Sequence, residues 1–299
     1  MAKNEPLRRY YYEIEVMRKQ NYPSIKDIIW YLEEHDINKS KRTVERDFEQ
    51  IRNNFGIYID YDSHKEGYYI REDLSVNLDS FIRFLEVANT AQLLLKGISE
   101  TKDFIKDIEF DLRGGLLGTE NLHFLLEAIK KQQKIHFLHY NYLKEEETDV
   151  LLDPYFLKEY MGRWYVVGLR EDGKIRTFGI DRISDLVITP LNFVKSEDVK
   201  ARENFDSIIG LVYSKGKQQR IVLSFTSRQG KYVKSLPWHH SQKVLEDNDK
   251  ELRISLFVVP NFELYQQILM NGADIEVIEP EWLRKEIKGK IMDALNRYK

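Results

Sequence analysis

The spacing of apolar residues changes once along this chain, and the change divides it into a helical part and a part rich in strands. In the first part apolar residues recur every three or four positions, as at Val44, Phe48 and Ile51, which is the spacing of one helix face. From Ile135 onward the pattern switches to short strand-like runs separated by turn residues. A chain of 299 residues is long enough for two or three domains. We therefore expect a multidomain α+β protein.

The composition is that of a folded protein, with 42% hydrophobic and 32% charged residues. The chain has no cysteine, which excludes disulfide bonds and thiolate metal ligands. No segment resembles a signal peptide, and no apolar run approaches the roughly 18 residues of a membrane span, so we expect a cytoplasmic protein without membrane contact. The net charge of −3 gives no overall attraction to nucleic acid. Any contact with DNA must therefore rest on a local basic patch.

Three helices and a β-hairpin are predicted within the first 73 residues. One helix is expected over residues 7–20, a second after the N-cap Ser24, with Asp27 in a loose capping-box position, and a third after the N-cap Ser40. Strand-like runs at residues 57–61 and 68–70, with a polar turn between them, then predict the hairpin.

The third helix combines an apolar face with a basic one. Such a helix, placed after a short turn and before a hairpin, is suited to project basic and amide side chains into a major groove. An ordinary amphipathic surface helix would carry the same two faces, so the pattern alone leaves both interpretations open. The candidate DNA-binding residues are Ser40, Lys41, Arg42, Thr43, Arg46 and Asn53 on this helix and His64 and Lys65 in the hairpin turn.

A helical connector is expected after the hairpin, with a loop at residues 113–115, and a further helix follows at residues 121–131. Several short strands then favour a small antiparallel barrel. Their expected ranges are 134–142, 151–157, 163–169, 174–180 and 185–190. Strands at residues 220–225, 251–259 and 274–278 then alternate with helices at residues 263–270 and 280–298.

Basic and aromatic residues are predicted to converge on this barrel. Alternation places Arg163 and Tyr165 on one face of their strand, and Arg176, Phe178 and, if that strand continues, Arg182 on one face of theirs. Guanidinium groups bind phosphates and aromatic rings stack on bases, so such a surface suits a nucleotide or single-stranded nucleic acid. Alternatively, the arginines pair with nearby acids and are purely structural. Those acids are Glu171, Asp172, Asp181 and Asp185.

Three motifs resemble a known family. The run S-K-R-T-V-E-R-D at residues 40–47 resembles the S-x-R-T-x-x-R-D signature of regulators in which a winged helix-turn-helix precedes a WYL domain, and G-Y-Y at 67–69 resembles their wing strand. The run G-R-W-Y-V-V-G-L at 162–169 resembles the motif that names the WYL domain, with Val166 where leucine is usual. The pairs Gly-Ala at 272–273 and Val-Ile at 277–278 resemble the WCX extension.

This resemblance implies a ligand-responsive transcription regulator that binds operator DNA as a homodimer and senses a negatively charged effector, a nucleotide or single-stranded nucleic acid. It implies a winged helix-turn-helix over residues 1–73, a helical connector over 74–118, an Sm-like WYL barrel over 119–195 and a WCX-like dimerisation and effector region over 196–299. The candidate ligand-binding residues are Tyr140, Arg163, Tyr165, Arg170, Arg176 and Arg182. Strict alternation puts Arg170 on the same face as Trp164, which is assigned to the core.

No motif argues for catalysis, because phosphate loops, nucleophile elbows and metalloprotease sequences are all absent. His136 and His139 are expected on opposite faces of one strand, and His239 and His240 have no third ligand near them in sequence. We therefore expect no enzyme activity, cofactor or metal.

An alternative function belongs to another class. The chain could be a nucleic-acid-processing accessory module, in which the barrel binds single strands and the winged helix docks a protein partner. A salt-dependent, sequence-specific footprint on double-stranded DNA would distinguish the regulator from this module.

Overall fold

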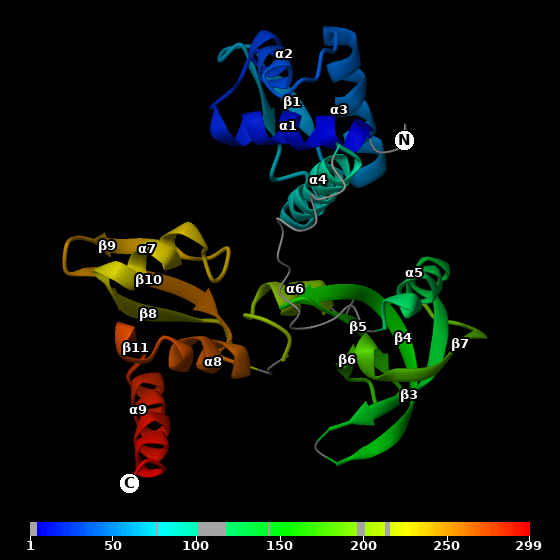
Figure 1. Ribbon diagram of the computed structural model, residues 1–299. Coiled ribbons are helices and arrows are strands. Elements are labelled where there is room, and N and C mark those ends of the chain that lie inside the picture. Colours follow the sequence, from blue (N-terminus) through cyan, green and yellow to red (C-terminus); the bar gives the residue numbers. More distant parts are fainter. Residues whose placement is uncertain (1–4, 76, 101–117, 143, 196–200, 213–215) are drawn as a thin grey trace. The chain divides into compact units, whose positions relative to one another are not determined.

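The computed structural model describes residues 5–75, 77–100, 118–142, 144–195, 201–212 and 216–299 (Figure 1). The chain divides into two compact units, Met1–Asp111 and Leu112–Lys299. The expected loop at residues 113–115 lies outside the described residues. Within the described ranges, no helix combines the length and the apolar character that crossing a bilayer requires.

The first unit contains the three predicted helices and the hairpin, followed by a long helix in the expected connector. The bounds are α1 Glu5–Lys19, α2 Ile25–Glu33, α3 Lys41–Phe55, β1 Ile59–Asp62, β2 Gly67–Ile70 and α4 Leu78–Glu100. β1 and β2 pair antiparallel, with Ile59 opposite Ile70. Val16, Ile28 and Val44 are fully buried where α1, α2 and α3 meet. A second cluster joins α1 and α3 to α4.

The turns of this unit are set by local contacts. Ser24 and Asp27 form the predicted capping box at the start of α2. α3 begins after Ser40 as predicted, but the Ser40 hydroxyl makes no capping bond and lies 3.2 Å from the Thr43 hydroxyl. Gly67 begins β2 where a Cβ atom would lie 1.9 Å from the Tyr22 carbonyl oxygen. Only a glycine fits there, and the hairpin therefore starts directly against the turn between α1 and α2.

The second unit begins with a helix and a five-stranded antiparallel sheet. The bounds are α5 Leu122–Lys131, β3 Gln133–Asn141, β4 Glu146–Tyr160, β5 Arg163–Arg170, β6 Ile175–Gly179 and β7 Ile183–Asn192. The strand order is β6-β5-β4-β3-β7, and a short 3-10 turn, η3 Ile180–Arg182, connects the two outer strands. All five predicted strands are present, with β4 longer than expected. Phe137, Val150 and Val166 form the buried core under α5.

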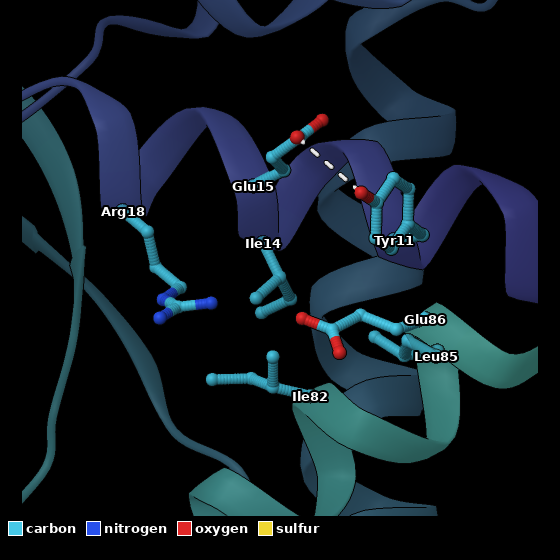
Figure 2. A pocket seen from close by; sticks show the side chains of 7 residues that line it. All are labelled: Tyr11, Ile14, Glu15, Arg18, Ile82, Leu85 and Glu86. Carbon is cyan, nitrogen blue, oxygen red and sulfur yellow. Dashed lines mark hydrogen bonds between the residues drawn. The ribbon is translucent and has the colours of Figure 1, made fainter. Parts of the chain in front are cut away.

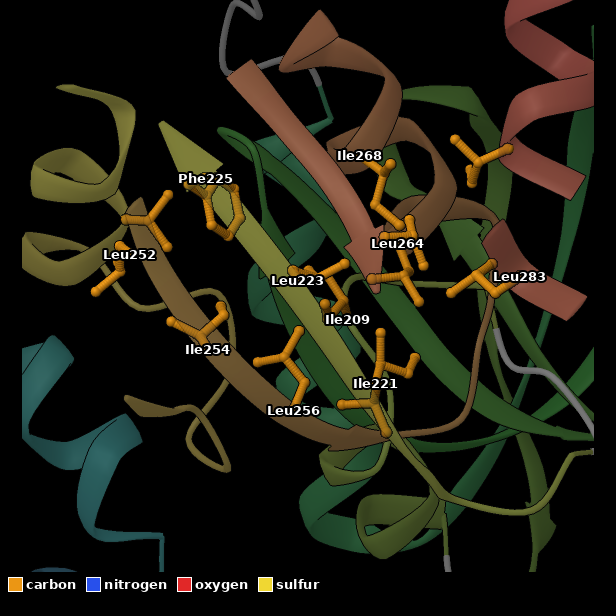
Figure 3. Close-up of a cluster of buried hydrophobic side chains, with 14 residues drawn as sticks. Ile209, Ile221, Leu223, Phe225, Leu252, Ile254, Leu256, Leu264, Ile268 and Leu283 are labelled. Atoms are coloured by element: carbon orange, nitrogen blue, oxygen red, sulfur yellow. The ribbon is translucent and has the colours of Figure 1, made fainter. Parts of the chain in front are cut away.

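A four-stranded antiparallel sheet with helices follows, in the order β11-β8-β10-β9. Its bounds are β8 Gln219–Thr226, α7 Ser227–Ser235, β9 Lys243–Asp247, β10 Glu251–Val258, α8 Phe262–Met270, β11 Ile275–Glu279 and α9 Glu281–Asn296. Figure 3 shows Leu223, Ile254 and Leu264 among the side chains that fill its core. The sequence predicted most of these elements but not α7 or β9.

The outer face of the five-stranded sheet is covered only in part. Val167 of β5 packs with Phe205 of α6 (Ala201–Asp206) and with Ile208 and Val259. Arg163, at the start of β5, remains exposed. The start of β5 is therefore the accessible end of this strand.

Candidate nucleic-acid interface and ligand cluster

α3 has one buried and one exposed face, as its sequence predicted. Val44 and Ile51 are fully buried. The opposite side exposes Lys41, Arg42, Arg46 and Asn53, which we call the basic face of α3. Lys41 lies 3.6 Å from Glu45. Among the described residues, Arg42 and Arg46 form no ion pair, so their guanidinium groups are available to a ligand.

The hairpin lies beside the first half of α3. The rings of Phe48 and Tyr68 are 5.2 Å apart. Burial raises the pKa of Tyr68, and the nearby Glu45 carboxylate adds to this while Lys41 opposes it. Tyr68 is therefore close to the start of α3, and the hairpin extends the surface that the basic face begins.

His64 and Lys65 are exposed in the hairpin turn. Their backbone N–H groups donate to Asp62 Oδ1 over 2.9 and 3.1 Å. These bonds lower the pKa of Asp62. The Lys65 ammonium lies 3.8 Å from the centre of the Tyr22 ring, so its side chain is drawn toward the turn between α1 and α2.

One charged residue of α3 points inward, which the sequence analysis missed. Asp47 is completely buried and pairs with Arg9 of α1, whose Nε lies 2.6 Å from Asp47 Oδ2. The signal was available in the sequence, because Asp47 lies three residues after Val44 and four before Ile51, on the apolar face. α3 therefore carries its cations outside and an acid inside.

In the second unit, three of the predicted ligand-binding residues come together. Arg163 Nη1 lies 3.5 Å from Asp181 Oδ2, and Arg182 Nε lies 3.8 Å from Asp181 Oδ1. Tyr165 lies close to these groups. Burial raises its pKa, the nearby Arg163 charge lowers it, and the nearby Asp181 charge raises it. We call Arg163, Tyr165, Asp181 and Arg182 the arginine cluster. A Cβ atom at Gly179, which is opposite Tyr165, would lie 2.5 Å from Asp181 Oδ1, so the missing side chain makes room for this acid.

Aromatic groups and a histidine adjoin the arginine cluster. The Arg182 guanidinium lies 5.0 Å from the centre of the Tyr142 ring, and the Tyr140 ring packs edge-on against Tyr142. His139 has a pKa lowered to about 4, by burial and by the charge of Arg182. Its Nε2 is buried and has no hydrogen-bond partner among the described residues. Of Tyr140, Tyr142 and His139, only Tyr140 was predicted from the sequence as a candidate for this site.

Two predicted ligand residues lie elsewhere, and the expected convergence of Arg176 with Arg163 is wrong. The register places Arg176 opposite Gly168 and Tyr165 opposite Gly179. Because directly opposite residues of an antiparallel pair share a face, Arg176 points to the other face of the sheet from Arg163 and Tyr165. Its guanidinium lies 3.5 Å from Asp172.

Arg170 lies at the far end of β5 from Arg163, opposite Leu152 of β4. The alternative that acids pair with the arginines is thus realised for Arg163, Arg176 and Arg182, but over long distances. Pairs at 3.5 to 3.8 Å with partly exposed partners contribute little stability, so they leave hydrogen-bonding capacity for a ligand.

The histidines do not assemble a metal site within the described residues. His136 Nε2 lies 2.8 Å from Asp149 Oδ1. His239 Nε2 lies 2.8 Å from the Asp206 carbonyl oxygen, and the other ring nitrogen contacts Ser241. Each of these rings is held by its own neighbours.

A small cavity lies between α1 and α4 (Figure 2). Its volume is about 70 Å³, far below the several hundred Å³ of a small-molecule site. The lining residues are Tyr11, Ile14, Glu15, Arg18, Ile82, Leu85 and Glu86. Tyr11 donates to Glu15 across 3.3 Å. We assign this cavity to imperfect helix packing.

Family models match two segments of the chain. The WYL domain matches residues 120–188 and the WCX domain matches residues 217–295. The chain therefore carries a WYL domain followed by a WCX domain, as the sequence motifs indicated.

Curated relatives and solved structures give more distant similarities. Protein PafB of Mycobacterium tuberculosis and of Mycobacterium bovis is 27% identical over 182 residues, which cover 59% of this chain and 54% of the relative. The match thus spans about half the length of these relatives. Proteasome accessory factor B/C (PafBC) of Arthrobacter aurescens is 17% identical with a TM-score of 0.31, over 95% of this chain and 45% of that one. A CRISPR Cas-related protein is 14% identical with a TM-score of 0.39, over 99% and 85%.

Proposed function

We propose that this chain, which carries a WYL domain followed by a WCX domain, is a transcription regulator that binds operator DNA through its first 73 residues. In this proposal α1, α2, α3 and the hairpin form a winged helix-turn-helix, with α3 as recognition helix. The observation that carries it is the basic face of α3, where Arg42 and Arg46 are exposed without an ion-pair partner among the described residues. Side chains of this type bind guanine edges and phosphates in a major groove.

The hairpin supports the same assignment. It lies beside the first half of α3 and exposes His64 and Lys65 at its turn. A wing in this position would contact the backbone or the adjacent groove while α3 occupies the major groove. Ser40 and Thr43, at the start of α3, would add phosphate contacts.

The WYL domain is proposed as a sensor of a negatively charged effector, a nucleotide or single-stranded nucleic acid. The arginine cluster would hold phosphate groups, and the adjoining Tyr140 and Tyr142 would stack on bases. Residues 74–118 and 196–299 would then serve as connector and as dimerisation region. In a homodimer, effector binding would shift the placement of the two winged helices and so change operator affinity by the coupling free energy.

Mapping of the DNA bound by the full chain across its own genome tests this function. We expect discrete sites with twofold symmetry that the purified chain protects in a footprint, with an affinity that falls as salt rises. A chain that binds single strands but protects no duplex site would contradict the proposal and would support the accessory-module alternative.

A further inference from the structure

Three ionisable side chains meet in the buried interface between α1 and α3. Arg9 is 6% exposed, and Glu13 and Asp47 are 0% exposed. Arg9 donates from Nε to Asp47 Oδ2 over 2.6 Å and from Nη2 to Asp47 Oδ1 over 3.0 Å. This is a bidentate, charge-assisted pair, the strongest geometry available to these groups.

Glu13 adds a second acid to this pair. Both of its side-chain oxygens are buried, and neither has a hydrogen-bond partner among the described residues. The Asp47 carboxylate is close enough to act on Glu13 through its charge. Two carboxylates at such range repel each other unless one of them holds a proton. Burial and the Asp47 charge raise the pKa of Glu13 well above its ordinary value, and Arg9 offsets this only in part. Burial and the Asp47 charge therefore favour the neutral form of Glu13, whose O–H can donate to the Asp47 carboxylate.

The other described ionisable groups near α1 act on its tyrosines and not on Glu13. Tyr10 of α1 donates to Gln50 of α3 over 2.6 Å. Burial raises the pKa of Tyr10, and the charges of Asp47, Arg9, Glu13 and Arg46 act on it. On the other side of α1, Glu86 of α4 acts on Tyr11. The charges that act on Glu13 itself are those of Asp47 and Arg9.

We propose that neutral Glu13 and the Arg9–Asp47 pair form a clamp that sets the rotation of α3 on α1 and loosens when Glu13 loses its proton. Loss of that proton to solvent leaves two buried carboxylates facing one guanidinium. Asp47 directly follows Arg46, so a rotation of α3 that separates Asp47 from α1 also turns the basic face. Glu13 and Asp47 are in this sense positioning residues. The consequence for DNA rests on the proposed function, whereas the clamp does not.

The direction of the pH dependence follows from the raised pKa of Glu13. At a pH below its ordinary value of 4.5, Glu13 is protonated in both the folded and the unfolded chain, so its full contribution to stability is present. As the pH rises above that value, the unfolded chain releases the proton and the folded chain retains it. The unfolding equilibrium constant then rises by up to about tenfold per pH unit until the folded pKa is reached.

Hydrogen exchange of the full chain tests the clamp. Wild type and Glu13→Gln are compared at the same pH, so that intrinsic exchange rates cancel, in peptides that cover α1 and α3. We expect protection in the wild type to fall relative to Glu13→Gln as the pH rises from about 5 to about 9, by up to about tenfold per unit until the folded pKa is reached. Glu33→Gln, at an exposed position of α2, is the matched control and should follow the wild type. Equal protection of wild type and Glu13→Gln across this range would overturn the clamp.

A comparison of single and double variants tests whether Glu13 can replace Asp47 as the partner of Arg9. In Asp47→Asn, Glu13 should ionise and pair with Arg9, so this variant should keep much of its α1 and α3 protection and lose the alkaline sensitivity. In the combination of Asp47→Asn with Glu13→Gln, Arg9 has neither acid, and protection should fall well below either single variant. Additive effects of the two substitutions would contradict the inference. Should Asp47→Asn not fold, the comparison of Glu13→Gln with wild type decides alone.

DNA binding provides a separate measurement. With the tightest-binding duplex recovered from a randomised library as probe, affinity of the wild type should fall at alkaline pH more than that of Glu13→Gln. Absence of any duplex binding, together with the expected exchange profile, would reject the proposed function but keep the clamp. Parallel affinity profiles with parallel exchange profiles would reject the clamp but keep the function.

Discussion

Arginines lie at both candidate sites, but the acids that accompany them lie in opposite places. On α3 the acid, Asp47, is buried beneath the helix, and the basic face carries Arg42 and Arg46 without an ion-pair partner among the described residues. In the WYL domain the acid, Asp181, lies between Arg163 and Arg182. An acid buried behind a basic face leaves most of the outward electrostatic field of the cations intact. An acid that lies among the cations cancels part of that field. The first arrangement suits a polyanion such as duplex DNA, and the second suits a ligand that competes with Asp181.

The largest expected difference between the two regions is in stability. Arg9→Met leaves Asp47 buried and without its cation, and should destabilise the first unit by about 3–5 kcal/mol. The same change at Arg163 should cost no more than about 1 kcal/mol, because its pair with Asp181 is partly exposed and 3.5 Å long. Denaturant unfolding, monitored in each unit by hydrogen exchange, measures the loss of stability in both variants. Equal losses of stability in the two variants would contradict this difference between the two regions.

Duplex binding should depend on the basic face of α3 and not on positive charge in general. Arg42→Ala and Arg46→Ala should each weaken operator binding by roughly 1–3 kcal/mol and relax sequence preference. Arg220→Ala removes an exposed cation from β8, where it pairs with Glu279, and should leave the affinity unchanged. Fluorescence anisotropy at fixed salt gives the three values. A loss as large in Arg220→Ala would indicate a nonspecific charge effect.

The acid within the arginine cluster should limit its affinity for anions. Asp181→Asn removes a negative charge beside Arg163 and Arg182 and should tighten binding of a single-stranded oligonucleotide by up to about 1 kcal/mol. Arg182→Ala should weaken the same binding, and both variants should retain duplex binding. Isothermal titration with the full chain measures the change. Weaker binding in Asp181→Asn would mean that this acid accepts a hydrogen bond from the ligand.

At neutral pH the smallest effect is expected from His139, because the sensitivity that it gives the WYL domain appears only in acid. The pKa of His139 is lowered to about 4 from an ordinary value of 6.5, so below pH 6.5 the unfolded chain takes up a proton that the folded chain does not. Stability of this domain should therefore be complete above pH 6.5 and decrease as the pH falls toward 4. His139→Gln should flatten this dependence, while His123→Gln, in α5, should not. Unfolding midpoints across this pH range provide the measurement, and identical slopes in both variants would contradict the assignment.

These two regions also differ in how well sequence reasoning described them. In the first unit it predicted the helices, the capping box at Ser24 and the exposed Arg42 and Arg46, because helix periodicity and capping are local properties. In the five-stranded sheet it predicted the strands but misplaced Arg176, because the face of a residue relative to another strand depends on register. It also assigned no role to Tyr142 or His139, which reach the arginine cluster through pairings that no local pattern encodes.

The sequence by itself determined most of the helices and strands and their order, the two faces of α3 and the presence of WYL and WCX domains, since these follow from periodicity and short motifs. Only the tertiary structure decided which charges meet. Arg9 and Asp47 are 38 positions apart and Arg163 and Asp181 are 18 apart, so their pairing depends on how distant elements pack. Burial then sets the strength and the protonation of each group, because the cost of a charge depends on the solvent that the fold removes from it.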